Sequence, residues 1–270
     1  MTILASREYK LMLRCSKFKG NEDKLKAAAM ALWQDLAGVM LAEAVAVSGT
    51  EDVQRKRRLV KFYDTGDRWL RANDYVVRER LDLTSNERQL TLKFRHPDRF
   101  ISQDRDMAPA AEYDLDVKFE EDIKPPFQAL YSHSSTVLLK DGAAIDTLSA
   151  VGKCYPGLAP AVGRFPDEET LVQVGQFTAY EQVLKGTSFK IRKDPAVDAV
   201  CSLTLWYASE DDPKPLVAEF SFKYADDKEN YSGKMARRAY DSFMGIQDRL
   251  GAWVDNKSMT KTAYVYALEH

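Results

Sequence analysis

Charged side chains recur at alternate positions in several short segments, and they are the residues best suited to chemistry. Arg78 and Arg80 lie two residues apart in one predicted strand, and Lys93 and Arg95 do so in the next. Because side chains at alternate positions of a strand point to the same face, each pair shares one face. Guanidinium and ammonium groups gathered in this way are typical of a site that binds phosphate oxygens. A pair of strand arginines taken alone is more often a solvated face.

Carboxylates follow the same pattern near both ends and in the middle of the sequence. Glu8 shares a strand face with Lys10, and Glu219 shares one with Lys223. A third segment, 112–118, alternates charged and apolar residues throughout. Carboxylate oxygens are the ligands that a hard divalent ion prefers. The alternative for these faces is a solvent-exposed strand edge protected by charge.

The elements that must position these residues are mostly strands. The opposite faces of the charged strands are apolar and need burial, which either an open sheet with one wet face or a closed barrel with a polar lumen could provide. Helices predicted at 21–36 and 231–253 could cover the outside of a barrel. We therefore predict an α+β fold, a closed antiparallel barrel of about eight strands with a charged lumen and peripheral helices. Strand segments are predicted at 6–14, 41–47, 57–63, 75–81, 88–95, 112–119, 178–185, 199–207 and 216–224, with a short one at 261–266.

The middle of the sequence, at about 125–165, shows no strong period and contains several Pro and Gly residues. It is predicted to be a helical insertion in a single domain that spans 1–267. The last three residues, 268–270, resemble the remnant of a purification tag and are left out of the functional argument.

The composition excludes several classes of function. The 39 Lys and Arg residues nearly balance the 41 Asp and Glu residues, so no overall field favours nucleic acid or an anionic membrane as partner. The three cysteines lack the spacing of a zinc site. The N-terminal segment meets charge too early for a signal peptide, and no apolar run is long enough to cross a membrane, so a cytoplasmic location is expected.

A longer pattern surrounds the paired arginines. The turn Phe62-Tyr63-Asp64-Thr65 precedes Asp67, Leu70 and the strand Val77-Arg78-Glu79-Arg80, and the strand Leu90-Thr91-Leu92-Lys93 follows. This order resembles the CYTH, or triphosphate tunnel metalloenzyme, family. The resemblance implies a triphosphate-bearing small molecule or inorganic polyphosphate as ligand, with Mg²⁺ or Mn²⁺ as cofactor.

The resemblance also assigns roles to individual residues. Metal ions polarise the phosphate, and water attacks in line. Glu8 and Lys10 are the expected catalytic residues. The expected phosphate ligands are Lys10, Arg78, Arg80, Lys93 and Arg95, with Lys118 and Lys185 as additions, and the expected metal ligands are Glu8, Asp114, Asp116 and Glu219.

Two positions depart from the family pattern. Ser6 stands where the first strand of the family has a glutamate, and Ser221 stands where a late strand often has its second glutamate. The main hypothesis is a metal-dependent hydrolase of inorganic or organic triphosphate. A class IV type of adenylyl cyclase and a catalytically weak polyphosphate-binding protein are the alternatives, and a homodimer is left open.

Overall fold

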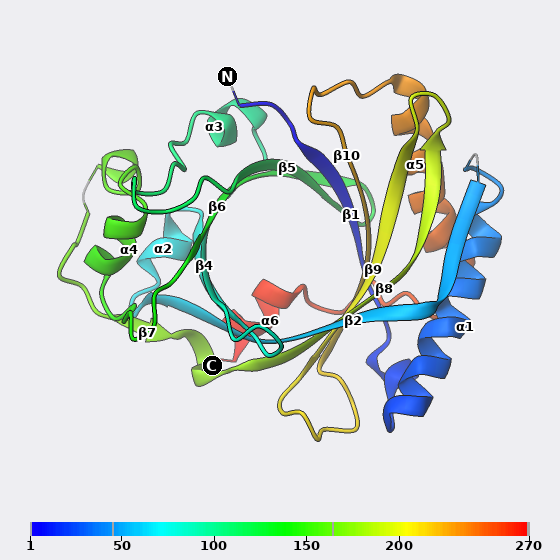
Figure 1. Cartoon of the computed structure of the whole chain (residues 1–270), viewed down its shortest axis with the longest axis horizontal. Coiled ribbons are helices and arrows are strands. Elements are labelled where there is room, and N and C mark those ends of the chain that lie inside the picture. The colour runs from blue at the N-terminus through cyan, green and yellow to red at the C-terminus, as the bar shows by residue number, and fades with distance from the viewer. Residues whose placement is uncertain (1, 45, 164, 269–270) are drawn as a thin grey trace.

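The strands of the chain form one sheet that closes on itself (Figure 1). The computed structural model describes residues 2–44, 46–163 and 165–268, apart from the side chains of 50–54. Nine strands form the ring in the order β3-β4-β6-β5-β1-β10-β9-β8-β2, and β2 pairs back with β3, while β7 extends β2 outside the ring. The strands are β1 (Ser6–Met12), β2 (Ala46–Thr65), β3 (Tyr75–Asp82), β4 (Arg88–His96), β5 (Val117–Lys124), β6 (Gln128–Leu138), β7 (Leu171–Gln173), β8 (Ala179–Arg192), β9 (Val197–Tyr207) and β10 (Val217–Ala225).

The predicted closed barrel is confirmed, with two corrections. The ring has nine strands rather than about eight, and it is not entirely antiparallel, because β1 runs parallel to β5. β1 is separated from β5 in the chain by β2, β3 and β4, so no hairpin has to join the two and they can pair in parallel. Strand β1 therefore fits between β5 and β10 and closes that part of the ring.

Two long helices cover one side of the barrel (Figure 1). Side chains of α1 (Glu22–Met40) and α5 (Gly233–Arg249) form one apolar cluster with outward-facing residues of the strands, among them Tyr9, Phe220 and Phe222. Asn21 caps α1 by accepting a hydrogen bond from the Lys24 amide, and Ser232 caps α5 in the same way. Burial of this outer face leaves the alternate side chains of β1 and β10 to face the lumen.

The opposite side of the barrel is covered by shorter elements. Val77, Leu90 and Leu92 are fully buried on the outer face of β3 and β4, where they pack in a second apolar cluster beneath α2 (Trp69–Ala72) and α4 (Leu148–Cys154). The period of two therefore turns the arginines and lysines between them inward. A further short helix, α3 (Arg99–Gln103), contacts β4 and β6, and single 3₁₀ turns occur at Cys15–Phe18, Pro160–Val162 and Val174–Gln176.

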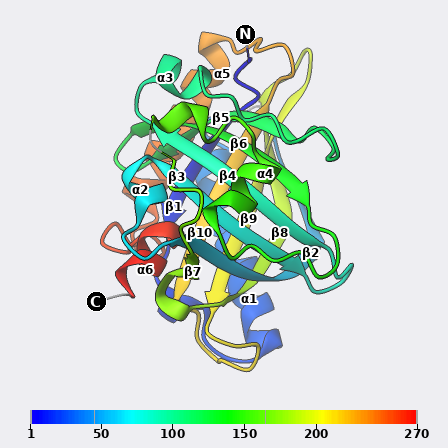
Figure 2. The same cartoon turned by 90° about the vertical axis from the view of Figure 1, so that its left-hand side faces the viewer.

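The segment at 261–266 is a helix, so the prediction of a strand there is wrong. In Figure 1, α6 (Lys261–Ala267) projects inside the ring of strands, and the side view in Figure 2 places it at one end of the barrel. Val265 and Tyr266 pack with Phe62 and Trp206 at that end. The helix forms because Thr260 caps it by accepting from the Ala263 amide.

The buried Asp64 forms hydrogen bonds with two helices at this end of the barrel. The Asp64 carboxylate accepts hydrogen bonds from the amides of Leu70 and Arg71, at 2.8 and 3.1 Å, and from the Tyr266 hydroxyl at 2.8 Å. It therefore fixes α2, which leads into the arginine strand, and α6 at once. The turn that carries the family resemblance positions elements of the barrel.

Three further predictions of elements need correction. The segment 112–116 is a loop, and β5 begins only at Val117. Alternation of charges does not distinguish a strand from an exposed loop, and Leu115 is 76% exposed. In the predicted insertion at 125–165, residues 128–138 form the barrel strand β6, so the helical segment begins only after it.

The predicted strand at 41–47 is replaced by the end of α1, a turn and the start of β2 at Ala46. Residues 269 and 270 of the predicted tag remnant lie outside the described residues. None of the described helices combines the length and the apolar character that a membrane span requires.

Candidate functional site

The lumen of the barrel is a cavity of about 660 Å³ with a large excess of positive charge. Ten cationic side chains and five carboxylates of the described residues line it. They come from eight strands and from α6, so only closure of the barrel brings them together. The cations are Lys10, Arg58, Arg78, Arg80, Lys93, Arg95, Lys118, Lys185, Lys223 and Lys261, and the carboxylates are Glu8, Glu120, Glu181, Asp198 and Glu219.

One part of the lining is an arginine cluster on β2 and β3. Arg58 Nη1 lies 3.3 Å from Glu181 Oε1, and Arg80 Nε lies 4.0 Å from the same oxygen. The Glu181 side chain is 1% exposed and also accepts from Trp206 Nε1 at 3.0 Å. Burial alone would raise the pKa of Glu181, but Arg80 and Lys261 outweigh it and lower that pKa to about 2. The Glu181 carboxylate is thus a shared counter-ion of Arg58 and Arg80.

Arg78 has no counter-ion of its own among the described residues. Its Nε is enclosed without a hydrogen-bond partner, as is that of Arg80. Burial, together with the positive charge of Arg80, lowers the pKa of Arg78 well below its ordinary value. A guanidinium held in this state gains free energy when an anion enters beside it.

The second part of the lining is organised by Asp122 on β5. Its carboxylate lies 2.7 Å from Lys10 Nζ, 3.3 Å from Lys93 Nζ and 3.6 Å from Arg95 Nη2, and it accepts from Ser132 Oγ at 2.7 Å. Burial alone would raise the pKa of Asp122, but these three cations hold it well below its ordinary value. Burial also lowers the pKa of Lys93 to about 8, although Asp122 opposes that shift.

Two further ion pairs lie in the lining of the lumen. Lys261 Nζ, at the start of α6, lies 2.8 Å from Glu219 Oε1. Glu120 accepts from Ser6 Oγ at 2.7 Å and lies 3.3 Å from Lys223 Nζ. The end helix is therefore joined electrostatically to the barrel wall.

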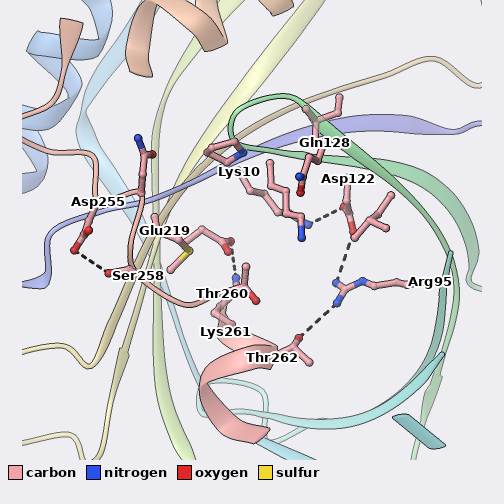
Figure 3. Close-up of a pocket in the computed structure, with 16 residues that line it drawn as sticks. Lys10, Arg95, Asp122, Gln128, Glu219, Asp255, Ser258, Thr260, Lys261 and Thr262 are labelled. Atoms are coloured by element: carbon pink, nitrogen blue, oxygen red, sulfur yellow. Dashed lines mark hydrogen bonds and ion pairs between the residues drawn. The ribbon is translucent and has the colours of Figure 1, made fainter. Parts of the chain in front are cut away.

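A smaller chamber adjoins the lumen behind the Asp122 cluster. Figure 3 shows Arg95 and Lys10 directed toward Asp122, and Lys261 toward Glu219, at the boundary. The chamber has a volume of about 280 Å³. Its walls combine apolar and hydrogen-bonding side chains, including Met12, Ile123, Leu130, Gln128, Asn256 and Thr260.

All seven side chains predicted to bind phosphate line the lumen. Lys10, Lys93 and Arg95 are partly enclosed, whereas Lys118 is 52% exposed and binds Asp116 at 2.7 Å. Their role as phosphate ligands stays a prediction. The predicted catalytic residues Glu8 and Lys10 also line the lumen and lie 3.1 Å apart.

The predicted metal ligands do not come together. Asp114 and Asp116 lie on the loop before β5, outside the lining of the lumen. Glu8 pairs in register with Lys223 and Glu219 with Met12, four residues farther along, which separates the two by about 13 Å of strand. No group of three His, Cys, Asp or Glu residues with metal-binding geometry occurs in the described part of the chain.

Glu8 and Asp122 are neighbours in the parallel register of β1 and β5, but Lys10 binds both of them. A cation at that place would have to displace the ammonium group. The residues present therefore do not fit a resident divalent ion, and Mg²⁺ or Mn²⁺ stays a prediction from the family resemblance.

Sequence reasoning missed Glu120 and Asp122 because it placed the strand five residues too early. The signal was incomplete, since Lys118, Glu120 and Asp122 share one strand face but Glu121 interrupts the apolar residues Phe119 and Ile123 on the other. Arg58 and Glu181 also line the lumen and are not among the site residues that the sequence predicts. Lys261 had no signal, because its place depends on how α6 docks.

The known structures similar to this chain that are named below share 13% or less of its sequence. No family model and no curated protein sequence matches it. Among solved structures, HpAC1 from Hippeastrum, described as a candidate adenylyl cyclase with a dominant triphosphatase activity, is 10% identical over 99% of this chain and 100% of that one, with a TM-score of 0.48.

A candidate adenylate cyclase from Bacillus halodurans is 12% identical over 92% of this chain and 100% of that one, with a TM-score of 0.34. The PH1819 protein from Pyrococcus horikoshii is 13% identical over 96% and 99%, with a TM-score of 0.33. By its motif residues and its closed barrel with a charged lumen, the chain is similar to the CYTH, or triphosphate tunnel, proteins.

Proposed function

We propose that the lumen binds the triphosphate group of a small molecule or inorganic polyphosphate, and that the protein hydrolyses a phosphoanhydride bond of that ligand. The observation that carries the proposal is Arg78, whose guanidinium lies in the lumen without a counter-ion among the described residues. Arginine suits phosphate because its planar fork can donate two hydrogen bonds to two oxygens. Arg78 and Arg80 would hold one phosphate together.

The chemistry of hydrolysis would depend mainly on charge. Water attacks the terminal phosphorus, the bridging P–O bond breaks, and the cations stabilise the negative charge on the leaving and equatorial oxygens. Lys10 and Lys93 are placed for this role beside the Asp122 carboxylate. Burial alone would raise the pKa of Glu8, but Lys10 lowers it, so Glu8 is ionised and suited to orienting water.

The chamber behind Asp122 favours an organic triphosphate as a second form of the ligand. Its volume of about 280 Å³ is close to the lower end of the range for small-molecule pockets, about 300 Å³. Met12, Ile123 and Leu130 offer apolar contact, and Gln128 and Asn256 offer hydrogen bonds. An organic group seated there would also allow a cyclase reaction, in which a ligand hydroxyl replaces water.

The carboxylates favour the remaining alternative, a protein that binds without turnover. Glu8, Glu120, Asp122, Glu181 and Glu219 all lie in ion pairs with lysine or arginine. None of them is free to act as a strong general base.

One set of assays separates these functions. The purified protein is incubated with tripolyphosphate, thiamine triphosphate and ATP, with and without magnesium or manganese, and phosphate, pyrophosphate and cyclic AMP are measured. Release of phosphate that is lost in Lys10→Ala and retained in Asp114→Asn, on the exposed loop, would support hydrolysis in the lumen. Binding without any product would contradict the catalytic part, and absence of binding would contradict the whole proposal.

A further inference from the structure

The lumen carries enough positive charge to neutralise a triphosphate by itself. The residues that line it include five more cations than carboxylates, and Asp122 at the boundary reduces this excess to four. Tripolyphosphate carries about four to five negative charges near neutral pH, because its terminal groups titrate near pH 6. The charge of the empty lining therefore matches the charge of the free anion.

The carboxylates of the lumen are already matched with protein cations. Lys10 lies between Glu8 and Asp122, at 3.1 and 2.7 Å, and Lys261 lies 2.8 Å from Glu219. A divalent ion that arrives with a phosphate would meet carboxylates that already hold ammonium or guanidinium groups. Displacing an ammonium group from such a pair leaves a partly buried cation without its partner, which is costly.

Two hydroxyl groups stand at places where further carboxylates would change this balance. Ser221 is buried in β10, directly opposite Lys10 in register and two residues from Glu219 on the same face. Ser6 donates its hydroxyl hydrogen to Glu120 rather than offering an anionic oxygen. The neutral residues at both positions keep the excess of positive charge in the lumen.

We infer that this lumen takes polyphosphate as a free anion, with protein cations in the place of a divalent counter-ion. The inference rests on the proposed phosphate-binding function and specifies the form of its ligand. A magnesium complex carries two fewer negative charges than the free anion, so the lumen attracts it less. Magnesium in solution therefore competes with the protein for the ligand.

Calorimetric titration with tripolyphosphate tests the inference directly. The titration is done with a metal chelator and again with excess magnesium, at matched ionic strength because salt screens these charges. We expect binding with the chelator, and affinity about tenfold weaker with magnesium. Affinity that is stronger with magnesium would overturn the inference while leaving phosphate binding intact. Absence of heat under both conditions would contradict the proposed function itself.

Ser221→Glu offers a second test with Ser221→Gln as its neutral control of equal size. The added carboxylate lies beside Glu219 on one strand face and next to Lys10 in register. We expect the glutamate variant to bind the free anion about tenfold more weakly and to recover affinity when magnesium is added. The glutamine variant, like the wild type, should bind tripolyphosphate more tightly with the chelator than with magnesium. Equal responses of the two variants to magnesium would overturn the inference.

Discussion

The two groups of cations in the lumen differ in how their charge is balanced. Lys10, Lys93 and Arg95 surround the carboxylate of Asp122. Arg78 and Arg80 lie on β3 beside Arg58 of β2, and Glu181 lies within ion-pair distance of Arg58 and Arg80. Every cation of the first group therefore has a carboxylate within ion-pair distance, whereas Arg78 in the second group has none among the described residues. If the lumen binds phosphate as proposed, we expect Arg78 to gain most from the anion, while Asp122 holds Lys10, Lys93 and Arg95 in place without it.

Asp122→Asn removes the carboxylate that Lys10, Lys93 and Arg95 share, and it has the largest expected effect. Loss of this charge leaves Lys10, Lys93 and Arg95 without their shared partner, so the free energy of unfolding should fall by about 3–5 kcal/mol. Tripolyphosphate should restore part of the lost stability, because the freed cations bind it. Thermal unfolding with and without the ligand measures both effects. The control is Asp241→Asn in the exposed pair with Arg237, which should change little.

The same carboxylate makes stability depend on pH. The pKa of Asp122 is lowered in the folded state, so its contribution is present above the unfolded pKa and is lost as pH falls through the folded value. The wild-type protein should therefore lose more stability on acidification than Asp122→Asn does. Parallel loss in the two proteins would contradict the role given to Asp122.

Arg78→Ala removes the cation of the arginine cluster that has no counter-ion among the described residues. Removing a charged donor to a phosphate should weaken tripolyphosphate binding by about 1.5–3 kcal/mol, or about 10- to 150-fold, with little loss of stability, since Arg78 has no protein counter-ion among the described residues. Titration calorimetry of this variant beside Arg237→Ala, an exposed position on α5, gives the comparison. Unchanged affinity in Arg78→Ala would contradict an arginine-centred site.

The pH dependence of tripolyphosphate binding tests the contribution of Lys93. Because its pKa is lowered to about 8 in the free lumen, anion binding above that pH must first protonate the lysine. Affinity for tripolyphosphate should fall by up to about tenfold per pH unit above pH 8. Lys93→Arg keeps its charge and should remove this fall. A fall of equal size in both proteins would assign the effect to another group.

Tyr266→Phe tests the end helix and has the smallest expected effect. It removes the hydrogen bond to Asp64 Oδ2 and should cost about 1 kcal/mol of stability. Because Asp64 keeps its bonds to the amides of α2, ligand affinity should stay close to that of the wild type. Chemical denaturation measures the change. A large loss of affinity would show that α6 shapes the lumen more directly.

The sequence predicts the cations of the lumen better than its carboxylates. Arg78, Arg80, Lys93 and Arg95 lie on neighbouring strands of one hairpin, so local alternation is enough to place them on one face. Asp122 was missed because β5 follows a loop with the same alternation of charges. The pairing of β5 with β1 joins residues more than 100 positions apart, and no local pattern encodes it.

The end of the barrel was predicted least well. Segment 261–266 has a pattern compatible with a strand, but Thr260 caps it as a helix and contacts with Phe62 and Trp206 dock it at the end of the barrel. The ion pair of Lys261 with Glu219 follows from that docking. Elements fixed by local periodicity were predictable, and those fixed by tertiary packing were not.

The most direct test of the central claim is a crystal structure of the protein with tripolyphosphate. The account predicts the anion in the lumen, with phosphate oxygens about 2.7–2.9 Å from the guanidinium nitrogens of Arg78 and Arg80. An anion bound only at the outer surface, with Arg78 still unpaired in the lumen, would contradict it.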